Sequence, residues 1–155
     1  ITHAFGILKK AAAQANAELK PEKMTDEKLA AISQACDEVM SGALNEHFPL
    51  VVWQTGSGTQ SNMNANEVIA NRALEIMGHA HGDYAFCSPN DHVNCSQSTN
   101  DAYPTAIHLG MYATHLKLLP YLEDLIAAFR RKGEEFAHIL NWQSEIPVSV
   151  RLCIR

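Results

Sequence analysis

Two short polar segments hold the residues best suited to chemistry. The first runs from Gly56 to Asn64 and the second from Ser96 to Asp101, and both are rich in small residues, hydroxyls and side-chain amides. Neither contains a lysine, an arginine or a cluster of metal ligands, and each leads into a segment with helical apolar spacing. A helix start presents free backbone N–H groups and the positive end of the helix dipole to an anion. These features predict a site that holds a small polycarboxylate through neutral hydrogen-bond donors.

Four segments with helical periodicity must position these loops. The first covers 3–19, and the second begins near Thr25 and ends at Gly42, a residue suited to a helix C-cap. A third covers 64–77, and the longest begins in the second polar segment and extends to about Leu140. Strand signals are nearly absent, so the sequence predicts an all-α protein. In the first helix, the predicted apolar stripe consists of Phe5, Leu8, Ala12, Ala15 and Leu19.

The longest predicted helix carries an apolar seam. Its apolar residues follow one another in steps of three or four, or the sum of both, which is typical of a helix packed in a bundle or coiled coil. The seam therefore predicts that this helix has partner helices. It consists of Met111, Leu118, Leu122, Leu125, Phe129 and Phe136.

The composition excludes several classes of function. The chain has 155 residues, is 46% hydrophobic and 19% charged, and has a net charge of −5. It lacks the basic surface expected of a protein that binds nucleic acid or a membrane, and no apolar run reaches the roughly 20 residues of a membrane span.

The sequence starts inside an amphipathic pattern, so we expect further residues before Ile1. Scattered cysteines are typical of reduced thiols in a cytosolic protein, and they are Cys36, Cys87, Cys95 and Cys153.

Three stretches of the chain resemble one known family. They are the first polar segment with its lead-in (48–64), the helix that follows it (66–73) and the opening of the chain (4–10). All three resemble the class II fumarases and aspartases, which are fumarate-forming lyases. The resemblance covers residues 1–140, and it implies an all-α fold.

The resemblance also implies a domain organisation. Residues 1–96 are expected to be part of an N-terminal helical domain, and residues 97–140 to be the start of a central helical-bundle domain. Residues 141–155 form a tail that does not match the family pattern. We expect this tail to be non-native.

Lyase chemistry on a C4 dicarboxylate is the activity that the resemblance implies, namely the reversible hydration of fumarate to L-malate. A base removes a proton next to a carboxylate, and the resulting aci-carboxylate needs hydrogen-bond donors aimed at its oxygens. By resemblance, these donors come from Ser57, Thr59, Ser98, Thr99 and Asn100. Hydroxyls and amides donate without adding a titrating group. The reaction requires no organic cofactor, and no metal site is predicted.

The resemblance places the catalytic residues outside this chain. In the family, a serine that acts as the base and a Thr-His pair come later in the sequence, so no catalytic residue is predicted here. Each active site combines segments from three subunits of a homotetramer. We therefore expect the chain alone to be inactive, and the whole protein to be cytoplasmic, or mitochondrial in a eukaryote.

Some residues favour the aspartases, which deaminate L-aspartate to fumarate. Trp53 and Ser57 are typical of fumarases, whereas Thr99 is typical of aspartases. Ser88 also favours an aspartase, because fumarases carry a histidine at this position as part of a secondary carboxylate site. In this chain that secondary site corresponds to Ser88, Asn90 and Asp91.

Two alternatives come from other classes of function. A catalytically inactive relative would serve as an oligomeric structural or binding protein. A metal-binding module would use His79, His81, Cys87 and Cys95, but the two histidines have no third ligand nearby in the sequence. Taken one at a time, the polar segments are also typical of an ordinary loop and of a helix N-cap. We interpret His92 as a structural residue.

Overall fold

A computed structural model describes residues 1–50 and 58–138 of the chain. The described residues contain no strand, so the predicted all-α class is confirmed. None of the described helices has the length and apolarity that a membrane crossing requires. In chain order, the elements are α1 (Thr2–Leu19), α2 (Asp26–Ser41), the helical turn η1 (Asn45–His47), α3 (Thr59–Ile76), the helical turn η2 (Pro89–Val93) and α4 (Thr99–Glu135).

The ends of α2 follow directly from the sequence. The Thr25 hydroxyl accepts a hydrogen bond from the Lys28 N–H at 3.4 Å, and two acidic residues occupy the first turn. Acidic side chains stabilise a helix start because they lie at the positive end of its dipole. At the other end, Gly42 takes the left-handed conformation with φ 85° and closes the helix. Both predicted ends of this helix are confirmed.

The predicted bounds of α1 are confirmed, but its predicted buried face is wrong. Leu19 is exposed, whereas Lys9 and Asn16 are buried. The helix faces this way because both polar side chains find hydrogen-bond partners inside the molecule, on the segment before α4. The residues of α1 that are buried are Ala4, Phe5, Gly6, Lys9, Ala13 and Asn16.

Helix α3 begins five residues earlier than the apolar spacing predicts. It starts at Thr59, directly after Gly58, which has φ 70°. The pattern hides this start because Asn62 and Asn66 occupy inward positions that apolar residues would normally mark, and both are fully buried. Most of the first polar segment is therefore the beginning of a helix and not a loop.

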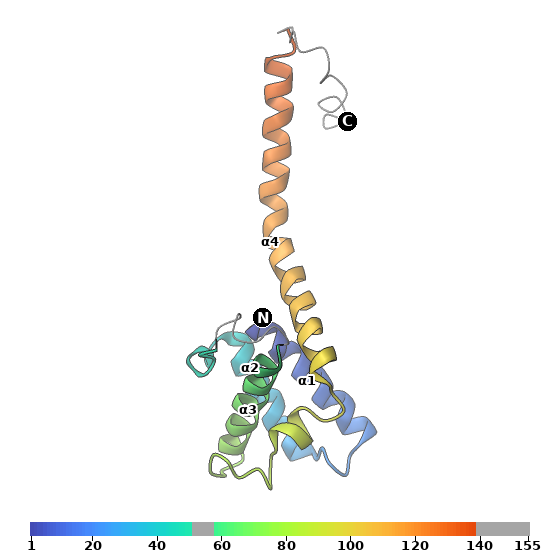
Figure 1. Cartoon of the computed structure of the whole chain (residues 1–155), viewed down its shortest axis with the longest axis vertical. Coiled ribbons are helices and arrows are strands. Elements are labelled where there is room, and N and C mark those ends of the chain that lie inside the picture. The colour runs from blue at the N-terminus through green and yellow to red at the C-terminus, as the bar shows by residue number, and fades with distance from the viewer. Residues whose placement is uncertain (51–57, 139–155) are drawn as a thin grey trace. The chain divides into compact units, whose positions relative to one another are not determined.

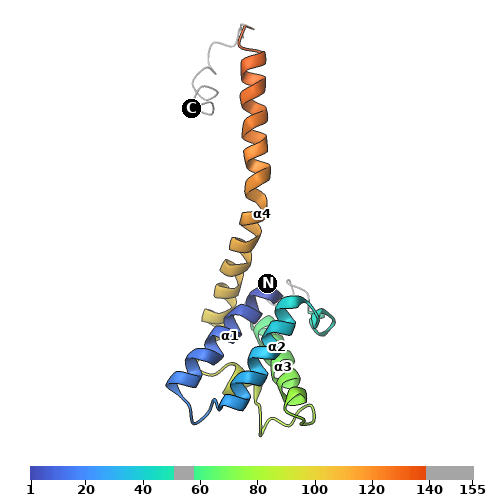
Figure 2. The same cartoon turned by 180° about the vertical axis from the view of Figure 1, so that it is seen from behind.

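The core lies among the first three long helices. Helix α1 packs against α2, and α2 packs against α3, as both views show (Figure 1 and Figure 2). A second, smaller cluster of Ala4, Phe5, Ala65 and Ala106 joins α1, α3 and the first part of α4. The main cluster consists of Ala13, Met24, Ala31, Ile32, Ala35, Cys36, Val39, Ile69, Ala70, Ala73, Leu74, Cys87 and Val93.

The chain divides into two compact units, the first of which is Ile1–Met111. The described part of the second unit, which begins at Tyr112, is the remainder of α4 and a final turn. Its apolar seam from Leu118 to Phe136 is exposed. The predicted domain limits at 96/97 and 140/141 stay predictions, and the tail 141–155 lies outside the described residues.

Candidate functional site

The starts of α3 and α4 lie next to each other. The Asn62 side chain in the first turns of α3 donates from Nδ2 to the Thr99 Oγ1 at 3.1 Å, and these residues are 37 positions apart. The ring of Tyr103 in α4 lies against the backbone of Gly58. Two helix N-termini, each with a positive dipole end, therefore meet in the first compact unit.

The hydroxyl groups at the start of α4 are arranged as donors. The Ser98 Oγ accepts a hydrogen bond from the Asn100 N–H at 3.2 Å, and the Thr99 Oγ1 accepts from Asn62. A hydroxyl that accepts one hydrogen bond still has its own proton to donate, so the Ser98 and Thr99 hydroxyls can each act as a donor to a ligand. Ser98 and Asn100 are exposed and Thr99 is half-buried. This arrangement suits the binding of an anion.

The remaining predicted donors belong to the start of α3. Thr59 is the first residue of this helix and is exposed, directly after the left-handed Gly58. Ser57 lies outside the described residues. The structure therefore brings Thr59 to the same pair of helix starts as Ser98, Thr99 and Asn100.

A buried lysine contacts the segment that leads into α4, and it is not among the predicted site residues. The Lys9 side chain is fully buried, and its Nζ donates to the Asn94 Oδ1 and the Gln97 Oε1, each at 2.9 Å. Burial lowers the pKa of Lys9 to about 8. The i, i+4 spacing of Phe5, Lys9 and Ala13 places Lys9 on the face that the two apolar residues mark, although a lysine is normally exposed.

Two buried amides on α3 complete this polar layer. The Asn62 Nδ2 also donates to the Asn94 Oδ1 at 3.3 Å, so that Asn94 accepts from both Lys9 and Asn62. The Oδ1 atoms of Asn62 and Asn66 are buried and have no hydrogen-bond partner within residues 1–50 and 58–138. Unpaired buried amide oxygens are unusual in native proteins, so their orientation needs a cause.

The predicted secondary carboxylate site lies at the start of η2. The Ser88 hydroxyl donates to the Asp91 Oδ2 and accepts from the Asp91 N–H, each at 3.1 Å, so both of its hydrogen-bonding capacities are used inside the turn. Ser88 is buried, whereas Asn90 and Asp91 are exposed. Ser88 therefore acts here as the N-cap of a helical turn.

His92 has a structural role in the same turn. Its Nδ1 accepts a hydrogen bond from the Ser88 N–H at 2.8 Å, and its Nε2 lies 3.0 Å from the Lys28 Nζ. Burial lowers the pKa of His92, and the nearby Lys28 charge lowers it further. The ring is therefore held in its neutral form, which agrees with the interpretation of His92 as a structural residue.

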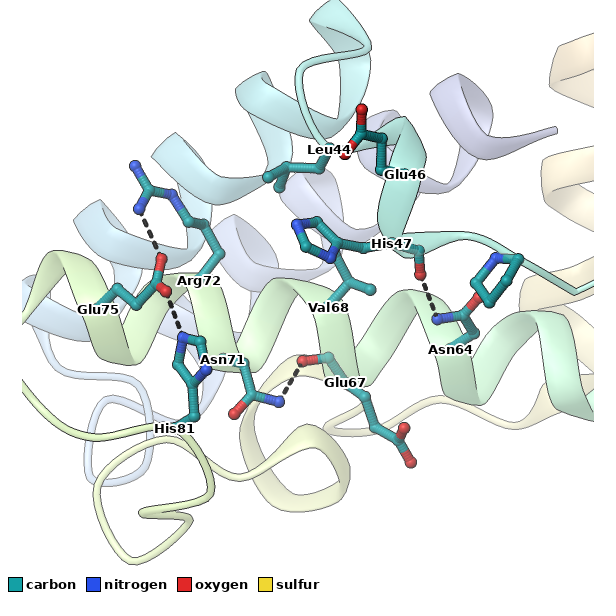
Figure 3. A pocket seen from close by; sticks show the side chains of 11 residues that line it. Leu44, Glu46, His47, Asn64, Glu67, Val68, Asn71, Arg72, Glu75 and His81 are labelled. Atoms are coloured by element: carbon teal, nitrogen blue, oxygen red, sulfur yellow. Dashed lines mark hydrogen bonds and ion pairs between the residues drawn. The ribbon is translucent and has the colours of Figure 1, made fainter.

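A groove of about 430 Å³ lies between α3 and the segment around η1, and it contains none of the predicted donors (Figure 3). Its cationic group, Arg72, is already engaged, because its Nε donates to Glu38 and its Nη1 to Glu75, each at 2.6 Å. These contacts hold the pKa of both carboxyl groups below their usual range. Glu46 and Glu67 add further negative charge. The groove is therefore poorly suited to a dicarboxylate.

The two histidines of the alternative metal module contact other side chains, and its two cysteines are buried. His81 Nε2 contacts the Glu75 carboxylate, and the His79 ring stacks on Phe86 with centroids 3.9 Å apart. Cys87 and Cys95 are buried. No group of three or more His, Cys, Asp or Glu side chains in the described part of the chain is arranged to hold a metal ion.

Comparison with known proteins gives one consistent family. A family model described as "Lyase" matches residues 1–142. "Fumarate hydratase 2" of Arabidopsis thaliana is 54% identical over 143 residues, which cover 91% of this chain and 28% of that protein. "Aspartate ammonia-lyase" of Pseudomonas canavaninivorans is 54% identical over 137 residues, which cover 88% of this chain and 28% of that protein.

Solved structures agree with the sequence matches. A "fumarate lyase:delta crystallin" of Brucella melitensis superposes with a TM-score of 0.79 at 51% identity, over 89% of this chain and 32% of that chain. A recombinant class II fumarase of Schistosoma mansoni gives a TM-score of 0.76 at 42% identity, over 86% of this chain and 28% of that chain. The chain spans less than a third of the length of these relatives.

Proposed function

Because this chain belongs to the lyase family that matches residues 1–142, we propose that the whole protein is a fumarate-forming lyase that reversibly hydrates fumarate to L-malate. The observation that carries the proposal is the meeting of two helix starts, with hydroxyl donors at α4 held by Asn62 and by the Asn100 N–H. A dicarboxylate binds well to such donors because they satisfy its oxygens without a competing charge.

The proposed role of these residues is to bind the substrate and to stabilise its aci-carboxylate. In this intermediate, the extra negative charge resides on the carboxylate oxygens, and preorganised donors stabilise it more than they stabilise the substrate. We assign this role to Ser57, Thr59, Ser98, Thr99 and Asn100. Loss of one such donor typically costs about 2.7–4 kcal/mol of transition-state stabilisation. The base belongs to a part of the family sequence that follows this segment.

An L-aspartate ammonia-lyase is the second candidate. The Pseudomonas aspartate ammonia-lyase and the Arabidopsis fumarate hydratase are equally identical to the chain, at 54%. Thr99 favours this candidate, and Ser57 favours the hydratase. Both reactions remove a proton next to a carboxylate and form fumarate, so the same donors serve either one.

The proposal includes features of the whole protein. We propose a homotetramer, in which residues 97–140 begin the central helical bundle and residues 1–96 belong to an N-terminal domain. The exposed seam of α4 supports such an assembly. We propose a cytoplasmic protein, or a mitochondrial one in a eukaryote. At the secondary carboxylate site, predicted at Ser88, Asn90 and Asp91, we assign a ligand contact to the exposed Asn90 alone, because Ser88 and Asp91 pair with each other and the Asp91 carboxylate would repel an anion.

The test uses the whole protein that contains this segment. The ultraviolet absorbance of fumarate is followed with L-malate and, separately, with L-aspartate. Activity on L-malate supports the hydratase, and activity on L-aspartate alone supports the ammonia-lyase. Activity on neither substrate, in a protein that is folded by circular dichroism, would leave the catalytically inactive relative as the better assignment.

A matched pair of variants tests the assigned donors. Thr99→Ala is expected to lower kcat/KM roughly 10²- to 10³-fold, because it removes one oriented donor. Thr105→Ala is the control, since Thr105 is also in α4 but its hydroxyl donates to the Asp101 carbonyl at 2.7 Å. Equal activities of the two variants would contradict the assignment of Thr99.

A further inference from the structure

Lys9 is a buried cation whose hydrogen-bond acceptors are neutral. The side chain is fully buried, and its ammonium donates to two amide oxygens, those of Asn94 and Gln97. Lysine is rarely fully buried without an acidic partner, because removing its charge from water is unfavourable. An apolar side chain of similar length would fill the same space without this penalty. We therefore expect the ammonium group of Lys9 to have a role that an apolar side chain could not perform.

The ammonium fixes the orientation of the two amides that it contacts. A lysine ammonium only donates hydrogen bonds, so Asn94 and Gln97 must both turn their oxygens toward it. Their nitrogens then face the backbone, where Asn94 Nδ2 donates to the Gln97 carbonyl at 3.1 Å and Gln97 Nε2 donates to the Val93 carbonyl at 2.9 Å. These bonds close the turn before α4, in which Ser96 has a positive φ of 59°.

The orientation of Asn94 in turn sets that of Asn62. Because the Asn94 Oδ1 faces Asn62, Asn62 must present its nitrogen, and its second N–H then donates to the Thr99 Oγ1. The Asn62 Oδ1 is left without a partner among the described residues. The orientation of the Asn62 amide is therefore set by the two acceptors of its nitrogen, Asn94 and Thr99, because its oxygen makes no hydrogen bond within the described part of the chain that could set it.

We propose that Lys9 is a positioning residue for the substrate site, and that it acts through Asn94 and Asn62 to keep the Thr99 hydroxyl oriented as a donor toward the ligand. This inference rests on the proposed function, because the direction of the Thr99 hydroxyl matters only if an anion binds there. Lys9 itself does not touch the substrate.

The opposite hydrogen-bond direction shows what Lys9 prevents. Without the ammonium, Asn94 can turn its nitrogen toward Asn62, and Asn62 can turn its oxygen toward both Asn94 and Thr99. The Thr99 hydroxyl then donates to the Asn62 Oδ1 and no longer to the substrate. The reversed arrangement leaves Asn62 and Thr99 in place and changes only the direction of their hydrogen bond, but it gives up the bond from Asn94 Nδ2 to the Gln97 carbonyl.

A double-mutant cycle in the whole protein tests the inference. Lys9→Met is expected to lower kcat/KM about tenfold when Thr99 is present, and by less than about twofold in a Thr99→Ala background, because the two residues act in series. Lys10→Met is the control, since Lys10 is the next residue of α1 but pairs with Asp37 at 2.7 Å. It is expected to stay within about twofold of the wild type. Additive losses for Lys9→Met and Thr99→Ala would overturn the inference.

A second variant keeps the test decisive if Lys9→Met does not fold. Asn62→Ala removes the contact that joins Asn94 to Thr99, and the same cycle with Thr99→Ala is expected to show the same loss of additivity. Additivity in this cycle would also overturn the inference.

A measurement without activity separates the inference from the proposed function. In the ¹⁵N-labelled 155-residue chain that also carries Leu122→Glu and Leu125→Glu to limit self-association through the exposed seam, Lys9→Met is expected to shift the side-chain amide signals of Asn62 and Asn94, and Lys10→Met is not. Unchanged signals in the Lys9 variant would overturn the inference even in an active enzyme. If the Lys9 variant shows these shifts but the wild-type whole protein is inactive on both substrates, the proposed function is contradicted and the hydrogen-bond chain from Lys9 to Asn62 still stands.

Discussion

Gly58 and Tyr103 approach so closely that no side chain fits between them. A β-carbon added at Gly58 would lie 2.2 Å from Cδ1 of the Tyr103 ring and 2.3 Å from its Cγ. Gly58 also has φ 70°, a conformation that residues with a β-carbon rarely adopt. Glycine is therefore required twice at this position, by the backbone of α3 and by the neighbouring helix α4.

Gly58→Ala is expected to destabilise the chain more than Gly78→Ala. Gly78 has φ 79° but nothing lies within 4 Å of its added β-carbon, so alanine there causes only the backbone strain of about 1 kcal/mol. Gly58→Ala adds a steric clash that typically costs about 1–3 kcal/mol more. Urea unfolding followed by circular dichroism measures both variants. Equal losses would show that Tyr103 moves aside freely.

The stability of the chain is expected to depend on pH through Lys9. Its pKa is about 8 in the folded chain, against an ordinary value of 10.5, so the unfolded chain binds more protons between these values. The contribution of Lys9 to the free energy of unfolding therefore rises by about 3 kcal/mol from pH 8 to pH 10.5. Lys9→Met lacks this rise.

The comparison with Lys9→Met isolates this titration. The Cys36 thiol on α2 is the titratable group that acts on Lys9 electrostatically, and burial raises its own pKa to about 12. Cys36 is present in both proteins, so its effect largely cancels in the difference. Urea unfolding across the alkaline range gives the two curves, and parallel curves would contradict the prediction.

The buried thiols are expected to resist alkylation in the folded chain. Burial raises the pKa of Cys36 to about 12 and that of Cys87 to about 11, so little thiolate exists near neutral pH. Iodoacetamide reacts with the thiolate, and both residues are also shielded from solvent. Peptide mapping by mass spectrometry should find both unmodified in the native chain and modified in denaturant. Rapid labelling of native Cys36 would show that α1 and α2 separate readily.

The exposed seam of α4 is expected to cause self-association of the 155-residue chain. Leu122 and Leu125 are 40% and 52% exposed, and large apolar patches of this kind are normally covered in stable proteins. Leu122→Glu combined with Leu125→Glu should reduce association. The control is Ala113→Glu with Ala127→Glu, because these positions lie on the opposite face of the heptad. Light scattering measures the molecular mass of the wild-type chain and of both double variants in solution. A monodisperse wild-type monomer at micromolar concentration would refute the prediction.

The sequence was a good guide wherever local chemistry determines structure. The ends of α2 were predictable because Thr25 and Gly42 act within one turn of the helix that they limit. The start of α4 was predictable for the same reason, since Ser98 caps it. The predicted donors Ser98, Thr99 and Asn100 gather there because they are consecutive in sequence.

Buried polar residues were beyond the reach of pattern reasoning. Apolar spacing cannot show that Lys9 and Asn62 point inward, because both residue types are normally exposed. Their burial depends on partners such as Asn94, which is 85 positions from Lys9. The start of α3 and the face of α1 were mispredicted for this one reason.

The contacts of Lys9 also have a consequence for the order of folding. They join residues 85 and 88 positions apart, so they raise the contact order of this region and close a long loop. During synthesis, α1 leaves the ribosome well before its partners Asn94 and Gln97 are made. The donor geometry at α4 therefore arises late, as a result of tertiary assembly, and a chain that stops before Asn94 has a first helix with its lysine unpartnered.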